Sequence, residues 1–328
     1  MIPTSGASRL PKAPMSVNAP RAWIGITAAL ITIAIWTSFI VVARASASHT
    51  LLPLDILALR VLGAAVILAP YAFWQRRKAR QSAELSSGTS LLGWSPLPLR
   101  ETAVVGVLAG FLYSGLAYTG FFYAPATHAS VLLPGTLPLW TGLLSLIWLN
   151  EKLSRQRTIG LLCILAGGVL VGSRSLLVSD DTGTAWIGDL LFLAASATWA
   201  TYGTAVRKFQ LDAVKATTAL VVAATFVYLP AYGLGLLLGI RSHLSIAPWE
   251  EMVFQAVYQG GGTLVIAGIT FNTMVKHFGP VRTTMMTSVV PSLSAISAVF
   301  FLGEIFTWQL AAGLALVTSG ILAGAFKR

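Results

Sequence analysis

The fold is decided by residues 130–172, which read SVLLPGTLPLWTGLLSLIWLNEKLSRQRTIGLLCILAGGVLVG. A long apolar run broken by prolines is followed by a short charged loop and a second apolar run. A shift of 153 residues repeats this pattern without a gap, placing Pro138 on Pro291 and Glu151 on Glu304. The other matched positions are Leu149 and Leu302, Gln156 and Gln309, Gly160 and Gly313, and Gly167 and Gly320. Such self-similarity predicts a chain built from two copies of one unit.

Composition places this repeat in a membrane. The chain has 328 residues, of which 55% are hydrophobic and only 10% are charged, whereas soluble domains carry roughly 25% charged residues. Several apolar runs reach about 20 residues, the length that a helix needs to cross a hydrocarbon core. We therefore predict an all-α polytopic membrane protein.

Ten apolar segments predict ten transmembrane helices. Their approximate limits are 22–43, 54–74, 102–122, 127–149, 157–173, 186–206, 215–239, 252–275, 283–303 and 307–326. The first and sixth segments both open with Ala-Trp-Ile-Gly, at Ala22–Gly25 and Ala185–Gly188. A cleaved secretory signal would not be copied in mid-chain, so the first segment is expected to be a membrane helix. The predicted domains are a tail (1–21), a first five-helix repeat (22–173), a linker (174–185) and a second five-helix repeat (186–326).

The distribution of Lys and Arg predicts the orientation. With the N-terminus inside, the cationic side chains that lie outside the spans are all cytoplasmic except Arg44, Arg174 and Arg241. This bias accounts for the net charge of +11 without a nucleic-acid partner. It also places both termini in the cytoplasm and the linker in the periplasm. Because each repeat has an odd number of spans, the second repeat must be inverted relative to the first, an arrangement common in secondary transporters.

Both repeats end in a proline-bearing helix, a short loop with a glutamate and a glycine-rich helix. The loops read Leu149-Asn150-Glu151-Lys152-Leu153 and Leu302-Gly303-Glu304-Ile305-Phe306, and Trp36 and Trp199 match in the opening helices. In these features residues 22–326 resemble the EamA-type drug/metabolite transporter superfamily, and most of all the YddG-type amino-acid exporters. The chain departs from the family pattern at Leu137 and Val290, where a Glu often precedes the helix proline, so no role of that Glu is carried over.

The resemblance implies a multi-pass transporter of the bacterial inner membrane, a monomer or homodimer whose partners are the lipid bilayer and a small-molecule substrate. An enzyme is not expected, because the four histidines, His49, His128, His243 and His277, are scattered at loops and span ends. The single cysteine, Cys163, lies in an apolar run and is read as a filler. We therefore expect no cofactor and no metal.

Trp36 and Trp199 are the first candidates for substrate contact. Each lies about 14 residues, or roughly 21 Å, into its helix, and inversion would set them on opposite sides of the midplane, where repeat interfaces form substrate sites. Their rings would stack on an apolar or aromatic substrate, with Tyr202 on the same face as Trp199. The alternative is that the tryptophans fill space between helices.

Polar side chains of the third and eighth spans are further candidates. Tyr118 lies in the third span, and Tyr258 and Gln259 precede the run Gly260–Gly262 in the eighth. Hydroxyl and amide groups at this depth need hydrogen-bond partners, which favours a polar central cavity. The glycines either allow close packing or mark local unwinding, and we expect packing.

Arg60 is an ionisable residue well inside a span, roughly 9 Å from the outer end of the second helix. A buried cation is costly and is a functional candidate for that reason. Arg60 could hold a substrate carboxylate, but it could also snorkel outward or pair with Asp55 or a carbonyl. We favour the structural alternatives slightly.

The remaining polar residues are expected near the span ends. Ser154 and Thr307 are placed to cap the helices that follow Glu151 and Glu304, whose role would be structural. His128 is expected at the outer interface, and Asp189 outside. Without a carboxylate near the centre of any span, a cation exporter or proton antiporter would lack its usual exchange site.

The best fit is a secondary transporter that exports neutral amino acids, including aromatic or hydrophobic ones, and related small metabolites by rocking of the two halves. The residues expected to bind the substrate are Trp36, Tyr118, Trp199, Tyr202, Tyr258, Gln259 and Arg60. Two alternatives remain open: an exporter of aromatic cations, which could use cation–π contacts, and an antiporter of phosphorylated metabolites.

Overall fold

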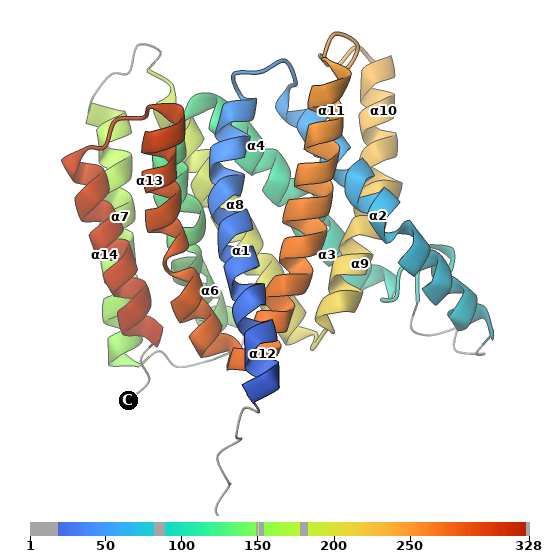
Figure 1. Ribbon diagram of the computed structural model, residues 1–328, viewed down its shortest axis with the longest axis horizontal. Helices are drawn as coiled ribbons and strands as arrows, with labels where there is room; N and C mark the ends of the chain where they lie inside the picture. The colour runs from blue at the N-terminus through green and yellow to red at the C-terminus, as the bar shows by residue number, and fades with distance from the viewer. Residues whose placement is uncertain (1–18, 82–88, 149, 151–153, 178–182, 326–328) are drawn as a thin grey trace, which may run out of the picture.

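The computed structural model describes residues 19–81, 89–148, 150, 154–177 and 183–325, and over these residues the chain is helical, with no named strand (Figure 1). The helices of the first half are α1 (Ala19–Ser46), α2 (Pro53–Gln81), η2 (Leu91–Gly93), α3 (Leu99–Val105), η3 (Gly106–Leu112), α4 (Tyr113–Tyr123), α5 (Ala126–Ser130), η4 (Val131–Gly135), α6 (Leu137–Trp148) and α7 (Arg155–Leu177). Those of the second half are α8 (Ala185–Lys208), α9 (Ala213–Ala223), η5 (Ala224–Tyr228), α10 (Leu229–Leu237), α11 (Trp249–Gln255), η6 (Ala256–Ile266), α12 (Ala267–Thr287), α13 (Val290–Leu302) and α14 (Trp308–Ala325).

Within the described residues, seven stretches are long and apolar enough to cross a membrane. They are Trp23–Ser46, Pro53–Arg77, Leu99–Tyr123, Ala126–Trp148, Arg155–Ser173, Val214–Leu237 and Trp249–Met274. Two shorter apolar helices, Val290–Leu302 and Trp308–Gly324, follow them. The predicted span 186–206 is helical as well and forms α8. A helix therefore stands at each of the ten predicted positions, and the chain has the form of a multi-pass membrane protein.

The boundaries differ from the predictions at three places. α1 begins at Ala19, so the last residues of the predicted tail are helical, and α7 runs on to Leu177 into the predicted linker. The span predicted over 283–303 is wrong at its start, because α12 continues to Thr287 and α13 begins at Val290. Pro291 explains this break: its missing N–H and fixed φ suit the first turn of a helix and not the interior. The rest of the predicted tail, residues 178–182 of the linker and Glu151 lie outside the described residues.

Helices from the two predicted repeats pack against each other along their length. α2 lies along η6, α4 along α8, α9 along η3, and α1 along α12 and α13. The approach of α2 to η6 is close: a Cβ added at Gly260 would meet the Arg60 carbonyl at 2.7 Å. Close packing was the expected role for the glycines of this span, and the contacts of Gly260 confirm it. The halves are thus interleaved around a shared interior.

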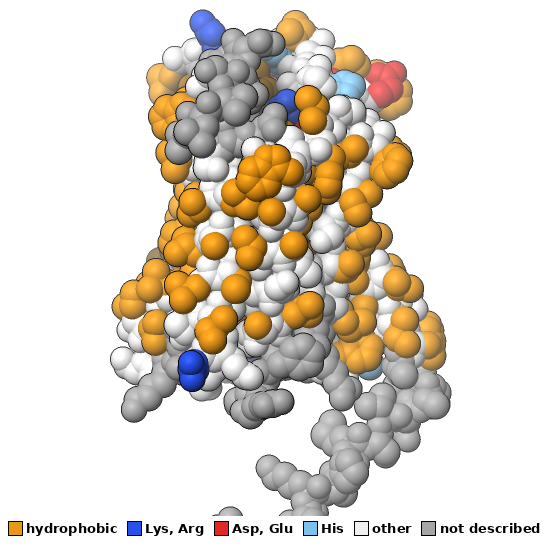
Figure 2. Space-filling view, turned by 90° about the vertical axis from the view of Figure 1, so that its left-hand side faces the viewer, with side chains coloured by type: hydrophobic (Ala, Val, Ile, Leu, Met, Phe, Trp, Pro, Cys, Tyr) orange, Lys and Arg blue, Asp and Glu red, His pale blue; other side chains and the backbone are white. Residues whose placement is uncertain are grey.

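α7 and α14 cross at one side of the molecule, at the left of Figure 1. A Cβ on Gly320 would lie 2.4 Å from the Gly160 carbonyl oxygen, and one on Gly167 would lie 2.7 Å from that of Gly313. Gly160 therefore contacts Gly320, and Gly167 contacts Gly313, so that the matched glycines of the two repeats meet in antiparallel order. On this face apolar side chains cover the middle of the molecule, while the charged side chains visible there lie towards its two ends (Figure 2). Such a belt suits contact with lipid.

The ends of the helices alternate between two faces of the molecule. α1 begins, and α14 ends, at the same face, which is the lower one in Figure 1. The turns after α1 and α13 lie at the opposite face. Ser154 and Thr307 accept hydrogen bonds from the backbone N–H groups of Arg157 and Leu310, each over 3.3 Å. The predicted capping of α7 and α14 is confirmed.

Candidate functional site

A cavity of about 90 Å³ lies between the two halves at mid-depth, with room for several water molecules at about 10–15 Å³ each. Its lining comes from both predicted repeats: Trp36, Phe39, Ile40, Arg60, Tyr113, Leu133, Pro134, Leu137, Ser196, Trp199, Thr263 and Val290. Among these lining residues Arg60 is the only ionised one. The cavity therefore combines apolar and aromatic walls with one positive charge.

Arg60 is held by a buried hydrogen-bond network between α2, α4 and η6. Its Nη1 donates to the Tyr118 hydroxyl and to the Gln259 carbonyl, each at 3.3 Å, and to the Thr263 hydroxyl. Tyr118 in turn donates to Oε1 of Gln259 over 3.0 Å. Arg60, Tyr118 and Gln259 are 4%, 1% and 0% exposed. The three predicted polar residues are thus brought together, and Arg60 among them borders the cavity.

The two structural alternatives that involve a charge or water are wrong for Arg60. With 4% exposure, the side chain does not snorkel to a surface. Asp55 is also fully buried, but it accepts from Tyr232 and from the backbone N–H groups of Leu52 and His243, at 3.0 and 2.9 Å. No carboxylate of the described residues lies within ion-pair distance of Arg60. The Gln259 carbonyl is a partner of Arg60, so the carbonyl alternative holds.

Aromatic rings form two walls of the cavity. Trp36 stacks on Phe271 with 5.1 Å between ring centroids. Trp199 lies between Tyr113 and Tyr202, at 4.8 and 5.1 Å. Both tryptophans are half-buried and face the cavity while packing on neighbouring rings. Packing and cavity lining are therefore combined at these positions.

Two predicted site residues lie away from the lining. Tyr202 packs behind Trp199, and the hydroxyl of Tyr258 bonds to that of Ser38 at 2.6 Å. In the structure they support neighbours and do not border the cavity.

The fourth span contributes lining residues that were not among the predicted site residues. The segment η4 is π-helical and contains Pro134, and π-helical turns often occur at functional sites. Because Pro138 has no N–H to donate, the Leu133 carbonyl in this segment accepts from the Ser196 hydroxyl over 2.8 Å. Leu137 and Val290, the places where the resembling family often has a Glu, both face the cavity. The prolines before and after them were the available signal.

Thr263 and Tyr113 were also missed as lining residues. Thr263 lies one helical turn after Gln259, and its hydroxyl donates to the Gln259 carbonyl at 2.7 Å. Tyr113 lies at the start of α4, five residues before Tyr118. Their spacing from predicted residues on the same helices was the signal that could have found them.

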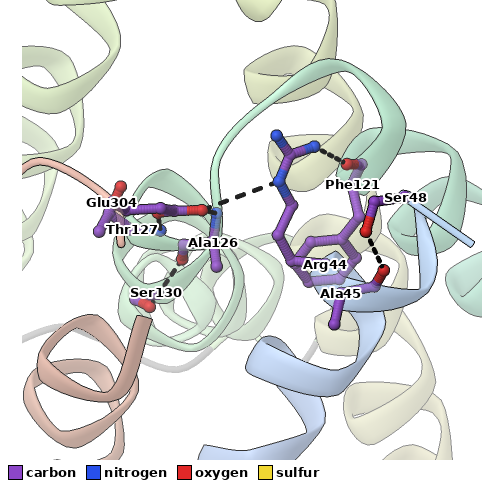
Figure 3. A network of polar contacts seen from close by, with 8 residues as sticks. All are labelled: Arg44, Ala45, Ser48, Phe121, Ala126, Thr127, Ser130 and Glu304. Atoms are coloured by element: carbon purple, nitrogen blue, oxygen red, sulfur yellow. Dashed lines mark hydrogen bonds and ion pairs between the residues drawn. The ribbon is translucent and has the colours of Figure 1, made fainter. Parts of the chain in front are cut away.

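Glu304 clasps three elements at the face opposite the chain-terminal helix ends (Figure 3). Its carboxylate accepts from the backbone N–H groups of Ala126 and Thr127, at 2.7 and 2.8 Å, and so caps α5. Arg44, in the last turn of α1, lies 3.7 Å from it and also donates to the Phe121 carbonyl at 2.5 Å. The structural role predicted for Glu304 is confirmed, and it consists of joining α1, α5 and the loop after α13.

His128 and Asp189 form a buried pair beside this clasp. Nδ1 of His128 lies 2.9 Å from Oδ1 of Asp189, and the residues are 8% and 5% exposed. Both side chains are thus buried within the protein and paired with each other, while their position towards the outer side of the membrane stays a prediction. Asp189 is the fifth residue of α8, and α8 is turned so that this face meets α5. Among the described residues no group of three His, Cys, Asp or Glu could hold a metal.

Comparison with known proteins gives a family match over most of the chain. The profile of the EamA-like transporter family matches residues 23–173 and 186–323, which are the two predicted repeats. Two proteins of Bacillus subtilis (strain 168) are similar to the chain, and both are named uncharacterized transporters. YoaV is 24% identical over 307 residues, which cover 90% of this chain and 95% of YoaV. YyaM is 24% identical over 238 residues, covering 68% and 73%.

One solved structure, described only as the crystal structure of a protein, matches with a TM-score of 0.55. The match covers 93% of this chain and 96% of the other at 22% identity. At this identity the likeness concerns the fold.

Proposed function

This chain belongs to the EamA-like transporter family, and from that membership we propose that it exports amino acids across the cytoplasmic membrane. The substrates are neutral amino acids, including aromatic or hydrophobic ones, and related small metabolites. The family and the relatives are transporters and not enzymes, so the cavity is read as a transport site.

The cavity between the halves is the observation that carries the proposal. Trp36 and Trp199 come from the opening helices of the two repeats and reach the same cavity, which is where inverted-repeat transporters bind substrate. Aromatic walls favour an apolar or aromatic body, and Arg60 can meet a carboxylate. Tyr118 and Gln259 hold that arginine. Tyr202 and Tyr258 belong to the proposed site as supports of Trp199 and Ser38.

We propose transport by alternating access, in ten membrane helices arranged as two inverted repeats. The alternation of helix ends and the common face of both terminal helix ends support this arrangement. The Lys and Arg bias argues that this face is cytoplasmic. Relatives from Bacillus subtilis support a bacterial cytoplasmic membrane, and the protein would work there as a monomer or homodimer.

Flux into proteoliposomes tests the proposal. Labelled phenylalanine and leucine should show saturable transport, while a quaternary aromatic amine and a sugar phosphate should not. Replacing Trp36 or Trp199 with Ala should lower that flux without loss of membrane insertion. Saturable transport confined to the phosphate or to the amine would replace the proposal with one of the two alternatives above.

A further inference from the structure

Arg60 places a full positive charge in the interior, and no charged side chain among the described residues pairs with it. The side chain is 4% exposed, and Asp55, the acid nearest to it in sequence, is engaged with Tyr232 and two backbone N–H groups. A guanidinium stays protonated in proteins, so Arg60 cannot avoid the cost of a buried charge by becoming neutral. A buried charge held only by neutral groups is costly, so the site gains most from a ligand that brings a negative charge.

Unused donors point to the same conclusion. All three hydrogen bonds of Arg60 leave from Nη1, and Nε has no partner among the described residues. Nε2 of Gln259 is likewise buried without a described partner, and Gln259 is 0% exposed. Nε and Nη2 form the edge of a guanidinium that receives a carboxylate through two parallel hydrogen bonds. Arg60 and Gln259, which holds it, therefore keep donors that the described residues do not use.

The walls restrict what else the anion can carry. Trp36, Phe39, Tyr113, Leu137, Trp199 and Val290 present rings and aliphatic groups. No carboxylate occurs among the described lining residues to receive an ammonium group. With one cation and no second one among these residues, a singly charged anion is matched better than a doubly charged phosphate.

We propose that Arg60 is the anion-binding residue of the cavity, and that the preferred ligands are monocarboxylates with an apolar or aromatic body, with or without an amino group. Tyr118, Gln259 and Thr263 act as positioning residues that hold Nη1 and leave Nε without a partner among the described residues. This inference rests on the proposed function for the identity of the site. It goes beyond that function in making the carboxylate sufficient for recognition, so that an amino group is not required.

A ligand series on the purified protein in lipid nanodiscs tests this by isothermal titration calorimetry. The compounds share one ring: 3-phenylpropionate, L-phenylalanine, phenylalaninamide, phenethylamine and phenyl phosphate. The two carboxylates should bind with similar affinity, and the amide and the amine at least about tenfold more weakly, the loss of one charge-assisted hydrogen bond. Equal affinity for phenylalaninamide, or a preference for phenyl phosphate, would overturn the proposal.

Variants separate recognition from structure. Arg60→Gln should abolish the preference for 3-phenylpropionate over phenylalaninamide, and Arg60→Lys, which keeps the charge without the fork, should retain part of it. Arg155→Gln removes an exposed arginine at the start of α7 and should bind like the unchanged protein. If Arg60→Gln lowers the affinity for acid and amide by one common factor, Arg60 is only structural. Should that variant fail to fold, Arg60→Lys and the ligand series decide.

The proposed function can fail separately. Tight binding of 3-phenylpropionate without any flux of labelled phenylalanine would retain the anion site and reject amino-acid export. Flux of phenylalanine together with equal binding of its amide would retain export and reject the anion site.

Discussion

Trp199 joins the aromatic packing of α8 to the wall of the cavity. Its ring lies between those of Tyr113 and Tyr202 and borders the same space as Trp36 and Arg60. A side chain in this position both lines the cavity and packs on the neighbouring rings. Replacing it with a smaller aromatic or with alanine therefore distinguishes the two roles.

We predict that Trp199→Ala lowers the flux of labelled phenylalanine at least about tenfold, because a stacking surface worth about 1 kcal/mol or more is lost together with the wall. Trp199→Phe, which keeps an aromatic face, should retain most of the flux. The measurement is initial uptake into proteoliposomes at matched protein content. As a control, Trp186→Phe changes an exposed tryptophan of the same helix and should have little effect; equal losses at both positions would show that Trp199 is only a packing residue.

For single residues, the sequence predicts which residue types line the cavity but not which face of its helix each residue occupies. Trp36, Trp199 and Arg60, which were selected as a charge and two large rings in mid-span, border the cavity, and their contact with a substrate stays a prediction. Tyr202 and Tyr258 were assigned to the same group, but their rotation about the helix axis places them behind it. In η6 the π-helical turns shift that rotation, and no local sequence signal fixes their number.

At the scale of elements, the close contact between α7 and α14 depends on glycines, which have no side chain to separate the two backbones. Gly320 and Gly160 bring the two backbones so close that a Cβ on Gly320 would lie 2.4 Å from the Gly160 carbonyl oxygen. Close approach of small residues is the main source of helix association in lipid.

Gly320→Ala should therefore force α14 away from α7 and cost about 1–3 kcal/mol of stability, the usual penalty for overpacking. Thermal unfolding of the purified protein measures this as a lower Tm. Gly324→Ala, one turn further on α14, is the matched control, because a Cβ there would meet nothing within 4 Å. Equal Tm values for the two variants would contradict the account.

The clasp at Glu304 makes a second prediction for elements. Glu304→Gln keeps the size but removes the charge that caps α5 and pairs with Arg44. The loss of charge-assisted hydrogen bonds should cost about 1.5–3 kcal/mol and loosen the contact between α1, α5 and the loop after α13. Hydrogen exchange of the Ala126 and Thr127 amides should rise. Glu250→Gln, at an exposed position of α11, should leave both amides protected; unchanged protection in Glu304→Gln would refute the clasp.

The sequence predicted the positions of the helices better than the breaks and contacts between them. The ten predicted apolar segments fall on helical residues, because apolar length is a strong signal, although α13 begins only at Val290 within the predicted span 283–303. The break between α12 and α13 was misplaced, since it consists of only two residues, Ser288 and Val289, shortly before Pro291. The pairing of Glu304 with α5 joins residues 178 positions apart, which no local pattern reveals.

For the whole molecule, the arrangement of ends predicts which loops share a side. Ser48 and Ser242 follow helices that rise to one face, and Ser154 and Gln210 lie at the other. In a protein with Cys163 changed to Ser, single cysteines at 48 and 242 should react with an impermeant maleimide added to intact cells. Cysteines at 154 and 210 should react only after the membrane is opened. Labelling of 48 and 242 on opposite sides would reject the inverted arrangement.

The two copies of the repeated unit contact each other at four glycines whose spacing is the same in both copies. The interval from Gly160 to Gly167 and that from Gly313 to Gly320 are both seven residues, and in the structure one interval lies antiparallel on the other. A residue inserted in one helix would carry its second glycine about 1.5 Å along and 100° around the axis, away from its mate. Any substitution at one of these four positions is therefore constrained by contact with the other copy.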